Sequence, residues 1–198
     1  MAQHPDHQAA NQTEPNPPQN EGRQSATTEE HRAQAPASVR CFVLTVSDTR
    51  SEADDSGGAL IRELLEAAGH QLVGSRIVRD DKIAIGEALS QAMDGLGDPD
   101  VIIATGGSGI GPRDVTPESV CPRVVKEMPG FGEEFRRLSW AEIGAAAMLS
   151  RAFAGVIGRT LVFVLPGSVN AVRLAMEKII VPELGHLVRE VRPERREA

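Results

Sequence analysis

The stretch VIIATGGSGIGP, residues 101–112, decides the fold that the sequence predicts. Its first five residues are apolar or β-branched, which is typical of a strand buried on both faces in the middle of a parallel sheet. The following residues contain four glycines, at positions 106, 107, 109 and 111. Glycine permits turns and close backbone approach that other residues do not. A buried strand that enters such a turn predicts a ligand site at its carboxyl end.

Outward from this stretch, apolar runs that fit buried strands alternate with segments of helical period. We predict strands at 41–46, 72–78, 101–105 and 161–165. We predict helices at about 61–68, 83–93, 116–126, 133–150 and 169–189, the fourth interrupted by Gly144 and the last disturbed by Pro182. This alternation indicates parallel strands joined by helical crossovers. The expected fold class is α/β, a three-layer sandwich with a mostly parallel central sheet flanked by helices.

Composition narrows the function before any motif is considered. The chain has 198 residues, 40% of them hydrophobic and 25% charged, which is ordinary for a globular protein. A net charge of -7 gives no bulk attraction for nucleic acid, and no apolar run is long enough to cross a membrane. Two cysteines cannot form a disulfide framework or a four-cysteine zinc site. We therefore expect a cytosolic protein that acts on small molecules, without nucleic-acid or membrane partners.

The chain divides into one domain and two tails. Residues 1–38 contain no Val, Ile, Leu or aromatic residue, so this segment cannot offset its ordering entropy by burial and is predicted to be a disordered N-terminal tail. Apolar segments begin at Val39 and continue to Val191, which gives one domain at 39–191. Residues 192–198 are charged and are predicted to be a fraying C-terminal tail.

Small, hydroxyl and carboxylate residues follow each predicted strand. Because the carboxyl ends of parallel strands meet at one edge of the sheet, these residues are candidates for one site. Exposed amides at a helix start favour anions, and paired carboxylates can hold magnesium. The pattern predicts a nucleotide or phosphate site. Its candidate residues after the four strands, in order, are Ser47 and Asp48; Asp80 and Asp81; Arg113, Asp114 and Thr116 beyond the glycine turn; and Pro166, Gly167 and Ser168.

Two common phosphate-binding motifs do not fit the glycine turn. Gly106 and Gly111 have the spacing of a P-loop, but Pro112 stands where the motif requires lysine. A dinucleotide fingerprint fails at the same proline. The glycines can also serve only a tight connection, and Asp80 and Asp81 can simply cap a helix or complement its dipole.

Five segments, read together and in order, resemble the molybdenum cofactor biosynthesis family, which includes the MoaB and MogA proteins and a domain of gephyrin. These segments are LTVSD at 44–48, TGGSG at 105–109, RDVTPE at 113–118, MPGFG at 128–132 and LPGS at 165–168. The resemblance covers essentially all of 39–191. Segments at 54–57, 68–70, 135–139 and 142–144, and the short C-terminus, are more similar to MoaB than to MogA.

The resemblance implies a molybdopterin-binding fold and, in active members, transfer of adenylate from MgATP to the terminal phosphate of molybdopterin with release of pyrophosphate. Two aspartates carry this reaction in active relatives, and they map to Asp80 and Asp114. Two carboxylates facing the phosphates of ATP require Mg²⁺ between them, so both are also the expected magnesium ligands. The adjacent Asp81 leaves open which carboxylate of that pair faces the phosphates.

The resemblance also implies the residues that bind molybdopterin or nucleotide, and a homotrimer or homohexamer that works with other proteins of the cofactor pathway. Ser108 replaces the usual threonine of the glycine motif and keeps its hydroxyl. The expected binding residues are Ser47, Asp48, Thr105, Gly106, Gly107, Ser108, Gly109, Ser150, Pro166, Gly167 and Ser168.

Two other functions stay open from the sequence. One is a catalytically silent protein that binds or carries molybdopterin, and the other is an unrelated nucleotide-binding enzyme that uses the same strand ends. Some MoaB proteins have lost the RDVTP motif, but this chain retains it at 113–117, which favours an enzyme. The two histidines of the domain, both cysteines and the aromatic residues are assigned no catalytic role. Phe131, Phe135 and Trp140 are expected in the core or at a subunit contact, and the small apolar segment 143–148 in close packing or an oligomer interface.

Overall fold

The computed structural model describes residues 35–95 and 98–195, and within them one sheet of six strands in the order β2-β1-β3-β6-β5-β4. The first four strands in this order pair in parallel, whereas β5 pairs antiparallel with both β6 and β4. The strands are β1 Arg40–Val46, β2 Gln71–Val78, β3 Val101–Thr105, β4 Lys126–Glu127, β5 Phe153–Ile157 and β6 Thr160–Leu165.

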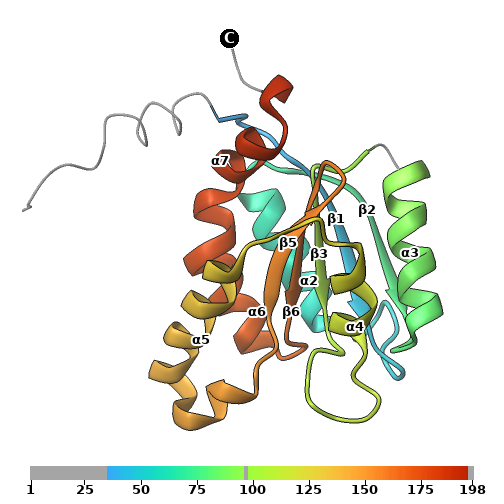
Figure 1. Cartoon of the computed structure of the whole chain (residues 1–198), viewed down its shortest axis with the longest axis vertical. Helices are drawn as coiled ribbons and strands as arrows, with labels where there is room; N and C mark the ends of the chain where they lie inside the picture. The colour runs from blue at the N-terminus through green and yellow to red at the C-terminus, as the bar shows by residue number, and fades with distance from the viewer. Residues whose placement is uncertain (1–34, 96–97, 196–198) are drawn as a thin grey trace, which may run out of the picture.

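Helices cover both faces of this sheet (Figure 1). They are α2 Ser56–Ala67, α3 Lys82–Gly95, α4 Thr116–Val120, α5 Pro129–Ile143, α6 Val169–Ala175 and α7 Val181–Val191, with 3-10 turns η1 Cys121–Arg123, η2 Gly144–Leu149 and η4 Pro193–Arg195 and a π turn η3 Met176–Ile180. One apolar core lies between the sheet and α2, α5, α6 and α7, and a second lies between the opposite face and α3 and α4. The expected three-layer α/β architecture is confirmed.

The central strands are buried on both sides, as their sequences predict. Along β1, Cys41 and Val43 face the first core, while Phe42 and Leu44 face the second. All five residues of β3 are buried as well. A strand without a solvent face needs no polar alternation, which explains why continuous apolar runs identify β1, β3 and β6 so clearly.

The helix predicted at 116–126 is wrong beyond its first turns. The structure ends α4 at Val120, continues with the 3-10 turn η1 and then forms the short strand β4. Pro122 explains the change, because proline lacks the N–H group that the next helical hydrogen bond would need. The helix predicted at 133–150 is also corrected. It begins at Pro129 and ends before Gly144, whose φ of 59° leaves the helical region, and η2 follows.

Strand β5 was not predicted from the sequence. It joins β6 in a hairpin whose ends pair Ile157 with Thr160, and Gly158 in the connection has a φ of 59°. Alanine and glycine within β5 have low strand propensity and weaken the pattern. The disturbance predicted at Pro182 is confirmed, since the π turn η3 precedes the first turn of α7 there. The first crossover helix starts earlier than expected, at Ser56, where the Asp55 side chain caps α2.

The described chain begins and ends beside the amino ends of the strands. Pro36 is buried, and its carbonyl lies close to Gly185 of α7. Arg192, which was assigned to the charged C-terminal tail, is only 2% exposed. Its guanidinium donates to both carboxylate oxygens of Asp98 at 2.6 Å and to the carbonyl of Arg159 at 2.8 Å. Arg192 therefore packs against the domain.

The predicted tails lie mostly outside the described residues, at 1–34 and 196–198, and stay predictions there. Among the helices that the structure does describe, none has the length and apolar character needed to span a membrane.

Candidate functional site

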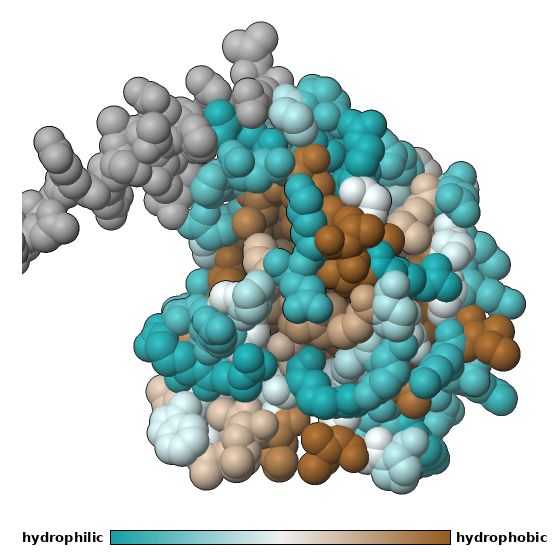
Figure 2. Space-filling model, viewed as in Figure 1, coloured by the Kyte–Doolittle hydropathy of each residue, from teal (hydrophilic) through white to brown (hydrophobic). Residues whose placement is uncertain are grey.

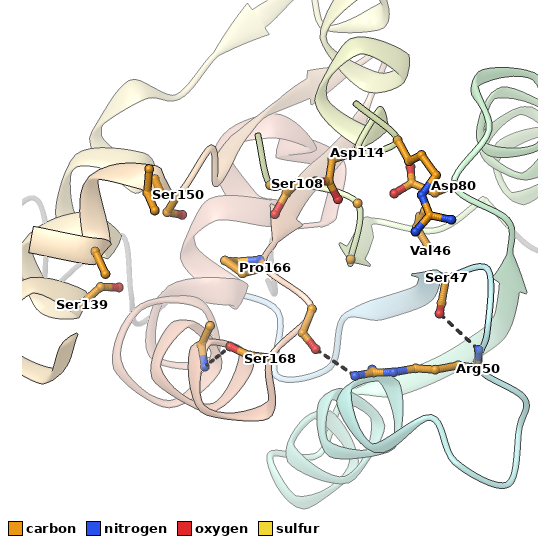
Figure 3. A pocket seen from close by; sticks show the side chains of 18 of the residues that line it. Val46, Ser47, Arg50, Asp80, Ser108, Asp114, Ser139, Ser150, Pro166 and Ser168 are labelled. Atoms are coloured by element: carbon orange, nitrogen blue, oxygen red, sulfur yellow. Dashed lines mark hydrogen bonds between the residues drawn. The ribbon is translucent and has the colours of Figure 1, made fainter. Parts of the chain in front are cut away.

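A cavity of about 650 Å³ opens at the carboxyl edge of the sheet. Its walls come from the loops after β1, β2, β3 and β6, and from α5 and η2. Figure 3 shows Asp80 and Asp114 on one side of it and Ser139 and Ser150 on the other, with Pro166 and Ser168 between them. The edge of the sheet named by the sequence therefore does hold the main cavity of the described residues.

The glycine turn brings the backbone against neighbouring segments from two directions. Gly106 has a φ of 99° and Gly107 a φ of 58°. A Cβ atom on Gly106 would overlap the carbonyl of Val46, and one on Gly107 would overlap the Asp80 carboxylate and the Thr116 hydroxyl. Packing alone therefore requires glycine at both positions. This agrees with the alternative in which the glycines serve a tight connection.

Asp80 and Asp81 point to different places. The Asp80 side chain lines the cavity and accepts a hydrogen bond from the backbone N–H of Val115 at 3.0 Å. The Asp81 carboxylate instead accepts from the N–H groups of Ile83 and Ala84 at 3.0 and 2.9 Å, where it caps the start of α3. The choice that the sequence left open thus falls on Asp80 as the residue that faces the cavity.

Asp114 lines the same cavity as Asp80, although more than thirty residues separate them in sequence. Its carboxylate accepts the N–H of Gly111 at 2.8 Å. Burial raises the pKa of the Asp80 carboxyl, and the negative charges of Asp114 and Asp48 raise that pKa further, against the Val115 hydrogen bond and Arg113. The carboxylates are therefore close enough to repel one another.

This carboxylate pair fits magnesium that arrives with a phosphate ligand. The described residues contain no group of three His, Cys, Asp or Glu side chains arranged to hold a metal ion by themselves. Mg²⁺ is usually bound by one or two carboxylates together with substrate phosphates and water. Burial and the neighbouring carboxylates raise the pKa of Asp80, so a cation bound beside it would stabilise its charged form.

Two arginines supply positive charge at the cavity. Arg50 donates to the carbonyl of Gly167 at 3.2 Å (Figure 3). It also lies 3.7 Å from the buried carboxylate of Asp55. Arg113 is 87% exposed and lies 3.8 Å from Asp48. Arg50 was missed by the sequence prediction. The signal available for it was only its position four residues after the end of β1.

The serines expected to bind ligand also shape their loops. Ser47 accepts the N–H of Arg50 at 3.2 Å, Ser168 accepts the N–H of Ala171 at 3.4 Å, and Ser150 accepts the N–H of Ala152 at 3.3 Å. Each of these three hydroxyls serves as an acceptor, and each serine lines the cavity.

Most of the other expected binding residues also line the cavity, and one does not. Those at the cavity surface are Asp48, Gly106, Gly107, Ser108, Gly109, Pro166 and Gly167. Thr105 is fully buried, is absent from the lining and donates to the carbonyl of Pro166 at 3.0 Å. The structure therefore places Thr105 behind the cavity wall, where its hydroxyl holds the Pro166 loop.

An apolar wall from α5 and η2 was not assigned to the site from sequence. Phe135, Ile143, Ala147 and Leu149 line the cavity there. Figure 2 shows apolar side chains gathered along the lower edge of the visible face, where α5 and η2 lie in Figure 1. Apolar residues at helical spacing fit a core, an interface or a ligand wall equally well, so the pattern alone did not separate these roles.

The residues assigned no catalytic role differ in how deeply they are buried. Phe131 packs in the core with its ring 5.1 Å from that of Phe163. Burial raises the pKa of the Cys41 thiol to about 12, so it is not a nucleophile at neutral pH. Burial lowers the pKa of His70, which lies away from the cavity. Trp140 is 59% exposed and is therefore not a core residue.

Comparison with known proteins identifies the family. A family model for a probable molybdopterin binding domain matches residues 42–186. Molybdenum cofactor biosynthesis protein B of Halalkalibacterium halodurans is 53% identical over 170 residues, which cover 85% of this chain and 99% of that protein. The protein of the same name from Bacillus subtilis is 50% identical over 171 residues, with 85% and 99% coverage.

Solved structures agree with these relatives. A crystal structure of molybdenum cofactor biosynthesis protein B has 51% identity and a TM-score of 0.77, and covers 81% of this chain and 99% of its own. The tungsten cofactor synthesizing protein MoaB from Pyrococcus furiosus has 43% identity and a TM-score of 0.73, with 80% and 99% coverage. The chain therefore belongs to the MoaB/MogA family of molybdenum cofactor biosynthesis proteins and carries its molybdopterin-binding domain.

Proposed function

We propose that this protein adenylylates molybdopterin with MgATP and releases pyrophosphate. One observation carries the proposal: Asp80 and Asp114, which come from two distant loops, line one cavity together with the glycine turn. A protein that only bound a pterin would have no evident need for two mutually repelling carboxylates at its ligand surface.

The proposed reaction is a phosphoryl-type displacement in which the terminal phosphate of molybdopterin attacks the α-phosphorus of ATP. A new P–O bond forms to the adenylate, the bond from the α-phosphorus to its bridging oxygen breaks, and pyrophosphate leaves with the electron pair. The nucleophile is already ionised, so no covalent enzyme intermediate is needed. Positioning and charge compensation then supply most of the rate enhancement.

The residues of the chain divide this work by charge. Asp80 and Asp114 would hold magnesium, which neutralises charge on the phosphates when it is bound. Arg50 and Arg113 offer guanidinium groups to phosphate oxygens at the same cavity. The glycine turn lets ligand oxygens approach the main chain closely, while Leu149 offers an apolar surface for the pterin rings.

The direct test is pyrophosphate release by the purified protein in the presence of ATP, magnesium and molybdopterin. We expect release only when all three are present, and a loss of 100-fold or more in the Asp114→Asn variant, as is typical when a group that stabilises transition-state charge is removed. Asp94→Asn is the matched control, because Asp94 is exposed on α3 and does not line the cavity. Absence of release by folded wild-type protein would refute the proposal.

A molybdopterin-binding protein without catalysis is the second candidate, and the apolar wall of α5 and η2 favours it. That wall suits a pterin ring whether or not transfer follows. The two functions can be distinguished in a strain that depends on this protein for cofactor synthesis. If an Asp114→Ala variant still supports synthesis, the protein is a carrier. If synthesis is lost, it is an enzyme.

We also infer that the protein works as a homo-oligomer, a trimer or hexamer, beside other proteins of the cofactor pathway. Trp140, Ile143, Met148 and Leu149 are large apolar residues on α5 and η2, and each is at least half exposed. An exposed apolar cluster of this kind is typical of a protein interface. ATP as co-substrate fits a cytosolic location.

A further inference from the structure

Arg151 connects three segments that build the candidate site. It follows Ser150 directly and precedes strand β5. Its guanidinium donates through Nε to the carbonyl of Ser108 at 3.3 Å and through Nη2 to the carbonyl of Asp114 at 2.9 Å. Its Nη1 donates to the carboxylate of Glu118 on α4.

These three acceptors lie in the glycine turn, in the RDVTP segment and in α4, on one side of the candidate site. Ser108 lies in the glycine turn, Asp114 is the carboxylate residue of the RDVTP segment, and Glu118 is in the first turn of α4. A guanidinium is planar and holds its donors in a fixed fork. One side chain therefore fixes the distances between the glycine turn, the Asp114 backbone and α4.

Arg151 acts from behind the cavity wall and does not line the main cavity. It lines instead a smaller hollow of about 330 Å³ on the outer side of the Asp114 loop, together with Lys82 and Glu118. The hydrogen bond from Arg151 lowers the pKa of the Glu118 carboxyl, which favours its charged form. Arg151 thus contacts segments that build the cavity but is not part of the cavity lining.

Other hydrogen bonds of the Asp114 segment are made within its own loop or to the glycine turn. The Asp114 carboxylate accepts from Gly111 within its own loop, and Thr116 bonds to the carbonyls of Gly106 and Gly107. Arg151 adds a link from the segment that enters β5, on the far side of β6 from the Asp80 loop. Thr116 therefore ties the end of the Asp114 loop to the glycine turn, whereas Arg151 holds the backbone carbonyl of Asp114 itself.

We propose that Arg151 positions Asp114 against the glycine turn for adenylyl transfer, so that the carboxylate and the backbone of the turn address the same phosphates. The proposal rests on the proposed function. It goes further in naming a residue outside the cavity that governs the geometry of the reaction.

The test compares Arg151→Gln and Arg151→Lys with Arg173→Gln as the control. Arg173 also pairs with a glutamate, Glu177 at 3.0 Å, but it lies on α6 and does not line the cavity. We expect Arg151→Gln to lower kcat for pyrophosphate release about 30-fold or more, to raise the half-saturating magnesium concentration about fivefold, and to change KM for molybdopterin less than threefold. Lysine cannot reach three acceptors at once and should restore less than a tenth of the lost rate.

A second measurement does not depend on catalysis. Without ligands, hydrogen exchange of the amides at 106–116 should become about tenfold faster in Arg151→Gln and remain unchanged in Arg173→Gln, while the amides of β3 stay protected in both. If Arg151→Gln does not fold, Glu118→Gln weakens one of the three ties and should show the same pattern at about a third of the size on a logarithmic scale.

The outcomes separate the two proposals. Wild-type exchange at 106–116, or wild-type kcat and magnesium dependence, in a folded Arg151→Gln protein would overturn the role of Arg151. Failure of the wild-type protein to release pyrophosphate overturns the proposed function and the transfer role of Arg151 with it. The exchange measurement then still shows whether Arg151 orders the Asp114 loop.

Discussion

Asp80 and Asp81 show how backbone donors separate the roles of two adjacent carboxylates. Asp81 accepts two N–H groups at the start of α3 and is satisfied by the helix. Asp80 accepts one N–H group and has other carboxylates nearby. A sequence motif cannot distinguish the two residues, because their roles differ only in the backbone N–H groups that each carboxylate accepts.

At this scale we predict that Asp80→Asn stabilises the protein while it removes activity. The pKa of Asp80 is raised in the folded state, so the folded protein binds more protons than the unfolded chain and its stability falls as pH rises through that range. The variant should therefore melt about 1–3 °C higher than wild type at pH 8. The gain should shrink at pH 4.5, where more of Asp80 is protonated. A lower melting temperature at pH 8 would contradict this account.

For Asp81→Ala we expect the opposite result, a loss of stability with nearly unchanged activity. Loss of the helix cap should lower the free energy of unfolding by about 0.5–2 kcal/mol, because two N–H groups of α3 lose their acceptor. Pyrophosphate release should stay within about threefold of wild type, measured alongside urea denaturation. A large loss of activity without a loss of stability would instead place Asp81 at the phosphates.

At the scale of elements, the C-terminal end of α7 is joined to the start of the sheet by a charged cluster. Arg192 is buried and reaches Asp98 and Asp100, and Arg40 of β1 contacts the same two carboxylates. Hydrogen bonds from Arg192, with its charge and help from Arg40, lower the pKa of Asp98 to about 2. The contribution of this ion pair to stability is therefore present above the ordinary aspartate pKa and is lost as pH falls from about 4 to 2.

We predict that Arg192→Gln lowers the free energy of unfolding at pH 7 by about 2–4 kcal/mol, because Asp100 is fully buried beside it and loses a cation. The difference in free energy of unfolding between the variant and wild type should be smaller at pH 3. Urea denaturation at pH 7 and at pH 3 measures this difference. The exposed pair of Arg137 and Glu134 is the control, and Arg137→Gln should change stability by less than about 1 kcal/mol.

Strands and helices differed in how well their sequences predicted them. The sequences of β1 and β3, which are buried on both faces, are continuous apolar runs that predict central strands well. Strand β5 carries small residues and pairs antiparallel at the side of the sheet, where neither propensity nor a crossover helix marks it. The helix predicted through 126 failed at Pro122, because a local pattern extended past a residue that cannot continue the hydrogen bonds.

For the whole molecule, a cavity lies at the edge of the sheet where the sequence predicts a site, since the order of strands and crossovers fixes where their carboxyl ends meet. It did not predict Arg50, Arg151 or the apolar wall of α5. Arg50 is held by Gly167 and Arg151 by Ser108 and Asp114. These contacts join segments far apart in sequence, and no short motif encodes them.

At the same scale we predict an oligomer that depends on the exposed apolar residues of α5 and η2. Sedimentation or light scattering of the wild-type protein should give three or six times the chain mass of 21.2 kDa. Trp140→Lys combined with Met148→Lys should shift the population to smaller species, because charges at a buried interface are costly. The double variant Lys126→Glu with Glu127→Lys, on exposed β4, is the control. A wild-type monomer would refute the interface.

Figure 1 shows both ends of the described chain beside α7, at the opposite end of the sheet from the strand ends whose loops form the cavity. An anchor attached after residue 195 would thus hold the protein to a sensor surface with the cavity mouth turned toward the solution. Molybdopterin and ATP could then be passed over the same immobilised sample in either order.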